Sequence, residues 1–468
     1  MRPPIRLGSV AGVLTSLTLA LAGPAFAQGT EAPLRKSGLF GTTRVDAGNR
    51  DSFNLLFAPS EAFESALPPD ARFKVSRGGL DSGGYSSMLT TSADYTRTRR
   101  RTQLGATLLT SFKYYPRLDR VEPVSHSAGL GFTVRLPKQS SLQANSTAAY
   151  APAYLYQLFP RAPIAAPVEA IAADPDYRID TSDSYTYGTN LALTVGRTRG
   201  TRITATADYR HTDFHREIVT RPNLTTSGAG MKLSRGVTRN SGLSVEYQYR
   251  TGTYGLTGVS NEHRLALGAD YSYALSATRR AAFHVNVAPA LLELPESVVR
   301  ANLPIGVGAP IDAGAISNPD PRLYRLEGDA RLDLDVGRSW RATATYRRSV
   351  EYLAVLTEPV FSDAARVELN GLITRRIDVA AGGGYALGRS ALNHNSQSLR
   401  TDTGQLRLRY ALTRTLAVYS QYVYYYYDMH EQSYLAPNLP RTFEQHEVRV
   451  GFMLFVRPFG DTGKGRTR

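Results

Sequence analysis

The chain has 468 residues, of which 42% are hydrophobic, with a formal net charge of +15 at pH 7 and no cysteine. The lack of cysteine excludes a disulfide scaffold and thiolate metal sites. The basic residues are spread along the chain, which argues against nucleic-acid binding, and no segment beyond the N-terminus has the ~20 apolar residues of a membrane-spanning helix.

The first 27 residues have the features of a secretory signal peptide. Arg2 and Arg6 accompany an apolar run from Leu7 to Leu21, and Ala25-Phe26-Ala27 fits a small-x-small cleavage site. We therefore expect export and cleavage after Ala27.

Residues 28–84 are expected to form a periplasmic or lumen-plugging segment. Short strand-like stretches near 52–57 and 71–76 could also supply a first strand. From about Tyr85 to Phe459 we count seventeen strands with a period of two. Because a bacterial single-chain barrel has an even number of strands, the sequence predicts eighteen if 28–84 contributes one, and sixteen otherwise.

The strongest pattern lies between Tyr324 and Tyr352, where apolar and polar residues alternate. On the first half, one face carries Arg325, Glu327, Asp329, Arg331, Asp333 and Asp335. A period of two belongs to a β-strand, and six ionisable side chains on one face cannot pack in a soluble core. The alternation resumes at Trp340, with Arg348 as an exception on the apolar face. Lipid on one side and a polar lumen on the other satisfy both faces, so this stretch predicts a hairpin of a transmembrane β-barrel.

The charges also suggest a register for this hairpin. A turn at 337–339 places Asp335 opposite Arg341, Asp329 opposite Arg347, and Arg325 opposite Glu351. Opposite charges stabilise an antiparallel ladder, although a two-residue slip would keep the faces and change the pairs.

Connections alternate in length along the chain. Short ones fall near 98–101, 137–140, 198–200, 236–240, 277–280, 337–339, 375–377 and 412–415. Long ones fall near 115–123, 152–183, 213–222, 252–260, 292–320, 353–362, 389–398 and 429–441. Short periplasmic turns and long extracellular loops are typical of an antiparallel up-and-down outer-membrane barrel, whereas a soluble β-sandwich or propeller would need a less charged buried face.

Tyrosines gather at the strand ends next to the long connections and predict an aromatic girdle. The expected girdle residues are Tyr114, Tyr185, Tyr187, Tyr209, Tyr247, Tyr346, Tyr385 and Tyr422, with the rest of the cluster up to Tyr427.

Charges on the polar strand faces predict the lining of the lumen. The expected lining residues are Arg202, Arg210, Arg250, Arg325, Glu327, Asp329, Arg331, Asp333, Asp335, Arg341, Arg347, Glu351, Arg407, Arg409 and Arg449. Basic residues outnumber acids, and a basic lumen favours anions. The alternative is that these charges pair across strands and only hold the wall together.

Evidence for catalysis or metal binding is weak. His211 and His215 flank Asp213, but the segment is a strand end running into a loop, where solvated histidines are expected. The sequence also lacks a G-x-S-x-G motif. We therefore predict no catalytic residues, no metal and no cofactor.

As an architecture, residues 85–459 resemble the Gram-negative outer-membrane β-barrels and, more loosely, the porin-like barrels found with exopolysaccharide systems. The resemblance implies a last strand, here Val448–Phe459, that ends on an aromatic residue read by the barrel assembly machinery. The chain differs from this C-terminal strand pattern at Arg457 and Pro458, which interrupt the alternation, and in the polar tail 460–468 that follows.

Together these features predict an outer-membrane channel for small polar, anionic solutes. Its expected partners are outer-membrane lipid and lipopolysaccharide, the barrel assembly machinery, and small anionic or saccharide solutes, with no nucleic acid. The resemblance implies one alternative, a barrel component of exopolysaccharide export or surface attachment. An outer-membrane hydrolase is a second alternative.

Overall fold

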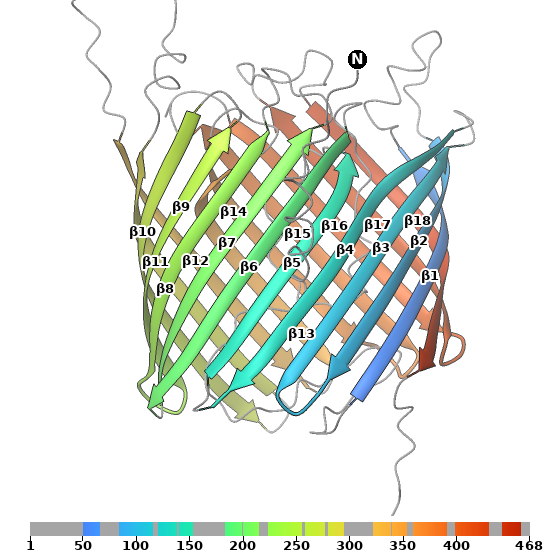
Figure 1. Cartoon of the computed structure of the whole chain (residues 1–468). Helices are drawn as coiled ribbons and strands as arrows, with labels where there is room; N and C mark the ends of the chain where they lie inside the picture. Colours follow the sequence, from blue (N-terminus) through green and yellow to red (C-terminus); the bar gives the residue numbers. More distant parts are fainter. Residues whose placement is uncertain are drawn as a thin grey trace, which may run out of the picture.

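The computed structural model describes residues 50–65, 84–115, 120–137, 140–152, 183–198, 200–214, 223–254, 258–276, 279–293, 322–337, 339–352, 359–390, 398–429 and 442–459. Within these ranges the chain forms one eighteen-stranded antiparallel sheet that closes into a barrel of tilted strands (Figure 1). The strands are β1 (Arg50–Glu64), β2 (Gly84–Thr98), β3 (Thr102–Tyr115), β4 (Arg120–Leu136), β5 (Ser140–Pro152), β6 (Asp183–Thr198), β7 (Thr201–Phe214), β8 (Leu224–Gly236), β9 (Ser241–Tyr254), β10 (Gly258–Ser276), β11 (Arg279–Glu293), β12 (Arg322–Val336), β13 (Trp340–Glu351), β14 (Val360–Leu372), β15 (Ile377–Ser390), β16 (Ser398–Ala411), β17 (Leu416–Met429) and β18 (Thr442–Phe459).

Each strand pairs with its neighbours in sequence, and β1 pairs with β18 to close the sheet. The prediction of an up-and-down barrel with eighteen strands is confirmed, and the alternative of sixteen is wrong. The strand that completes the even number is β1, which includes the predicted stretch 52–57. The other stretch, 71–76, the signal peptide 1–27 and the tail 460–468 lie outside the described residues.

The two ends of the barrel differ in their connections. At one end, here called the turn end, short connections join β2 to β3, β4 to β5 and the later hairpins, close to the predicted positions. Gly200 and Gly337 lie in two of these turns with φ of 102° and 78°, a conformation that favours glycine. The other end, the loop end, carries the longer connections, and β1 starts and β18 finishes at the turn end.

The seam between β1 and β18 has an interrupted ladder. Its register shifts between Phe53 and Leu55, and the pairing then passes from Phe57 directly to Ser60. Pro59 lies in this gap, and proline has no N–H to donate to a ladder. On its other side, β1 pairs continuously with β2.

The outer surface of the barrel is apolar. Large side chains stand exposed along it, including Leu267 at 61%, Val367 at 58% and Phe452 at 52% exposure. Residues at alternating positions face the lumen instead, and the described residues include two small apolar clusters. Among the described residues, no helix is long and apolar enough to cross a membrane.

Candidate functional site

The charged inner wall is the candidate functional site. The structure places all the expected lining residues at inward positions, alternating with exposed apolar side chains such as Leu406 and Leu408 on β16. They come from six strands: Arg202 and Arg210 from β7, Arg250 from β9, the six from Arg325 to Asp335 from β12, Arg341, Arg347 and Glu351 from β13, Arg407 and Arg409 from β16, and Arg449 from β18.

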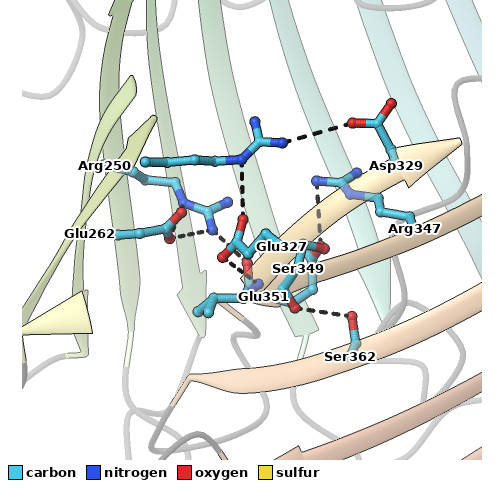
Figure 2. A network of polar contacts seen from close by, with 10 residues as sticks. Arg250, Glu262, Glu327, Asp329, Arg347, Ser349, Glu351 and Ser362 are labelled. Atoms are coloured by element: carbon cyan, nitrogen blue, oxygen red, sulfur yellow. Dashed lines mark hydrogen bonds and ion pairs between the residues drawn. The ribbon is translucent and has the colours of Figure 1, made fainter. Parts of the chain in front are cut away.

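The densest part of this wall is an ion-pair network near the loop end (Figure 2). Arg250 on β9 donates from Nε and Nη2 to Glu262 on β10, at 3.1 and 2.6 Å. Arg264 on β10 contacts Glu327 on β12 at 3.2 Å and Asp329 at 3.7 Å. Glu262 and Glu327 are only 2% and 3% exposed, so the network holds carboxylates that need these cations.

Small side chains on β11 make the reach of Arg264 across that strand sterically possible. Arg264 lies opposite Ala290 on β11, and Glu327 lies opposite Ala288. Both alanines are buried, at 3% and 0% exposure. The same wall continues toward the turn end with His284, which contacts Asp270 at 2.6 Å and Asp329 at 3.3 Å.

The loop end of β13 leaves its partner β12 and lies against the inner face of the wall, while it stays paired with β14, and β14 with β15. Here residues 349–352 and 359–362 are called the hairpin tip. The N–H of Val350 donates to Glu327 Oε1 at 3.1 Å, and its carbonyl accepts from Arg250 Nη2 at 2.5 Å. Arg250 belongs to β9, four strands away, so the tip crosses the inner faces of the intervening strands (Figure 2).

An apolar cluster holds the same tip against the wall. Val350 and Tyr352 pack with Leu224, Tyr254 and Leu292 from β8, β9 and β11. The Tyr352 ring centroid is 6.3 Å from that of Tyr254, and the guanidinium of Arg250 lies 4.7 Å from the Tyr352 centroid.

Glycine 252 makes room for the Tyr352 ring. A Cβ on Gly252 would lie 2.2 Å from Cδ1 of Tyr352 and 3.1 Å from its Cγ. These distances are shorter than van der Waals contact, so the space over Gly252 that holds the Tyr352 ring, here called its seat, requires a residue without a side chain.

The predicted register of β12 and β13 is correct near the turn and wrong at the loop end. Asp335 lies opposite Arg341 and forms an ion pair at 2.8 Å, and Asp329 lies opposite Arg347. The expected pair of Arg325 with Glu351 does not form. The ladder ends at Gly328 opposite Arg348, and Glu351 contacts Arg347 at 3.4 Å instead. The inward course of the hairpin tip is the cause.

A second set of buried charges lies on β15 to β18. Arg409 donates from Nε to Asp378 at 2.9 Å and also contacts it through Nη2. Arg449 contacts Glu447 at 2.6 Å. These two arginines are 1% and 2% exposed, whereas Arg341 at the turn end has a 56% exposed side chain. The inner wall therefore has both buried and open parts.

Sequence reasoning missed Glu262, Glu447 and Asp378 among the inward acids. Glu262 and Glu447 share the parity of the inward residues Arg264 and Arg449, which was a usable signal. Asp378 precedes the run from Val379 to Gly384, whose small residues give no contrast between faces. Its parity, opposite to that of the expected girdle residue Tyr385 on the same strand, was the remaining signal.

The eight expected girdle tyrosines lie at outward positions; Tyr114, Tyr185 and Tyr187 are close to the loop end, whereas Tyr247 and Tyr422 lie at the middle of their strands. Tyr422 contacts His446 through a hydrogen bond of 2.8 Å, and Tyr346 donates to Asp363 at 2.6 Å. Asp363 also lies 3.7 Å from Arg348, the exception on the apolar face. The wider tyrosine cluster requires a correction. Tyr425 and Tyr427 face inward and are buried, because strand alternation sends every second residue of that run into the lumen.

Only one histidine of the pair considered for metal binding lies in the described part of the chain. His211 contacts Thr225 through Nδ1 at 2.8 Å, and His215 lies outside the described residues. Among the residues that the structure describes, no group of three or more His, Cys, Asp or Glu side chains is placed to hold a metal ion.

Comparison with known proteins gives likeness at the level of the whole barrel only. No protein-family model and no curated protein matches the sequence. The chain is similar to OccK11 (OpdR) of Pseudomonas aeruginosa, with 13% identity, a TM-score of 0.39, and 88% of this chain and 96% of that chain covered. It is similar to OccAB2 of Acinetobacter baumannii with 11% identity, a TM-score of 0.42, and 87% of this chain and 98% of that chain covered. It is similar to the outer membrane protein OprD of Pseudomonas aeruginosa with 9% identity, a TM-score of 0.39, and 87% of this chain and 94% of that chain covered. At these identities and TM-scores the likeness assigns no function to this chain.

Proposed function

We propose that the chain is a channel in the outer membrane of a Gram-negative bacterium that passes small polar solutes and prefers anions. The observation that supports this proposal is the opposite chemistry of the two faces of the sheet. Leu267 and Val367 are more than half exposed on the outside, while Arg250 and Glu327 face inward. Lipid outside and water inside satisfy such a sheet.

The balance of charge on the open part of the wall supports a preference for anions. Glu262 and Glu327 are held by Arg250 and Arg264, which neutralises their fields. Within the described part of the chain, Arg202 and Arg210 on β7 form no ion pair with a carboxylate, and Asp208 between them and Glu351 near Arg210 offset part of their charge. Low-dielectric walls focus the remaining positive field on ions in the lumen.

Conductance in a planar bilayer tests the proposal. The refolded protein should open discrete conductances, and its reversal potential across a KCl gradient should indicate anion preference. The double variant Arg202→Gln/Arg210→Gln should shift that potential toward cation preference. Arg400→Gln is the matched control, because Arg400 faces outward with a 52% exposed side chain. A folded barrel that never conducts, or one that prefers cations, would contradict the proposal.

A further inference from the structure

Among the described residues, β12 and β13 part from each other at the loop end. Their ladder stops at Gly328 opposite Arg348, and of the described strands only β11 pairs with residues 322–327 of β12. β13 nevertheless stays paired with β14 up to Glu351 opposite Val360. β14 in turn stays paired with β15 up to Val360 opposite Ser390, so the hairpin tip has parted from β12 while it stays joined to the sheet on its other side.

The residues on either side of this opening are matched for pairing. Continuing the observed register would place Glu327 opposite Ser349, Leu326 opposite Val350, and Arg325 opposite Glu351. The pairs of Glu327 with Ser349 and of Arg325 with Glu351 would be polar and would face inward. The pair of Arg325 with Glu351 would also join opposite charges. The pair of Leu326 with Val350 would be apolar and would face outward. A barrel wall in lipid requires these residue types at these positions.

In the observed position the same residues have a different set of partners. Val350 bonds through both its N–H and its carbonyl to side chains of the inner wall, Glu327 and Arg250. Tyr352 fills the seat over Gly252. Within the tip, Ser349 Oγ donates to Glu351 at 2.5 Å, and Ser362 Oγ donates to the carbonyl of Ser349 at 3.4 Å (Figure 2).

We propose that the hairpin tip is a two-position gate of the channel. In the docked position, which the structure shows, it narrows the lumen near β9 to β12. In the released position it completes the ladder with β12, and Val350 turns toward lipid beside Leu326. Each position offers the tip its own main-chain and side-chain partners, so the tip has two discrete arrangements and not a continuous range. The inference deepens the proposed channel function and rests on it for its conductance readout.

Two pairs of cysteines can trap the two positions, and the chain has no cysteine of its own to interfere. Gly252→Cys/Tyr352→Cys joins residues that are in contact in the docked position. Leu326→Cys/Val350→Cys joins residues that meet only in the released position. Leu332→Cys/Ala344→Cys is the control, because these residues already lie opposite each other on β12 and β13. Directly opposed residues of an antiparallel pair have the spacing that a disulfide needs.

Oxidation is followed by mass spectrometry, independently of conductance, in the folded protein in lipid vesicles. All three pairs should oxidise. Oxidised Leu326→Cys/Val350→Cys should conduct more than its reduced form, reversibly with reductant. The conductance of the oxidised docked pair should not exceed that of its reduced form. Oxidation of the control pair should leave the conductance unchanged. A released pair that stays reduced while the other two oxidise would overturn the gate, as would one that oxidises without a change in conductance.

Gly252→Ala provides the same test without cysteines. The added Cβ expels the Tyr352 ring from its seat, so the conductance should rise above that of the native channel. Gly383→Ala is the matched control, because the nearest atom to a Cβ there is 3.6 Å away. An unchanged conductance in a folded Gly252→Ala barrel would overturn the gate. If the native protein never conducts, the proposed channel fails, while the oxidation of the released pair still reports the movement.

Discussion

Arg250→Met should be among the most destabilising single changes in the inner wall. Arg250 is the described cation that contacts Glu262, and the side chains of this pair are 20% and 3% exposed. Removing one partner of a buried pair costs about 3–5 kcal/mol, because the other charge stays buried without compensation. The lost hydrogen bond to the Val350 carbonyl adds about 1 kcal/mol. The total loss of about 4–6 kcal/mol corresponds to roughly a thousandfold to ten-thousandfold change in the folding equilibrium.

The double variant Arg250→Met/Glu262→Met separates the buried charge from the lost contact. With both charges gone, it should recover most of the loss, leaving about 1–2 kcal/mol for the hydrogen bond to Val350. Arg331→Met is the control. Its pair with Asp333 has side chains that are each 31% exposed, so it should cost about 1 kcal/mol or less.

Denaturant unfolding in lipid vesicles measures these free energies through the fluorescence of Trp340, because the chain has one tryptophan. If the double variant is no more stable than Arg250→Met, the cost does not come from the buried charge of Glu262, and the reasoning is refuted.

Two further changes test the packing of the turn end and the lipid-facing surface. Gly371→Ala would put a Cβ 2.1 Å from Cδ2 of Trp340, so it should shift the fluorescence and cost about 1–3 kcal/mol. Gly404→Ala, where the atom nearest to the added Cβ is 3.5 Å away, should change neither the fluorescence nor the stability. An unshifted fluorescence spectrum of Gly371→Ala would contradict the packing of Trp340 on Gly371. Val367→Lys on the lipid-facing side should cost about 2–4 kcal/mol in a bilayer. Asn370→Lys, inward near the turn end, should cost little, and equal costs at both sites would argue against a lipid-facing position for Val367.

The sequence predicted the fold well because each strand carries its own signal. The alternation between Tyr324 and Val336 defines both faces of β12 without reference to any other part of the chain. The turn at 337–339 then sets the register of its neighbour, as the pair Asp335 and Arg341 shows. Period and turn are local properties, so they can be read from the residues alone.

The hairpin tip could not be predicted, because nothing in its local pattern changes. Ser349, Val350 and Glu351 continue the alternation as if the ladder went on. What holds them inside the barrel is Arg250, a hundred residues away in sequence, together with the space over Gly252. A contact of this range leaves no local trace in the chain.

The tyrosine cluster failed for a different reason. Residues 424–427 are all tyrosine, so the run gives no contrast between polar and apolar faces. Only the register with β18 shows that Tyr425 and Tyr427 face inward. A parity rule needs two residue types, and this segment offers one.

The seam between β1 and β18 has a consequence for the order in which the barrel assembles. Pairing Phe53 with Phe459 closes a loop of about 400 residues, for which chain entropy alone costs about 5 kcal/mol. Hairpins such as β12 and β13, joined by a few residues, close at a small fraction of that cost. The hairpins are therefore expected to form first and the seam last, over a ladder interrupted at Pro59, so cylinder closure is the slow, late step of folding.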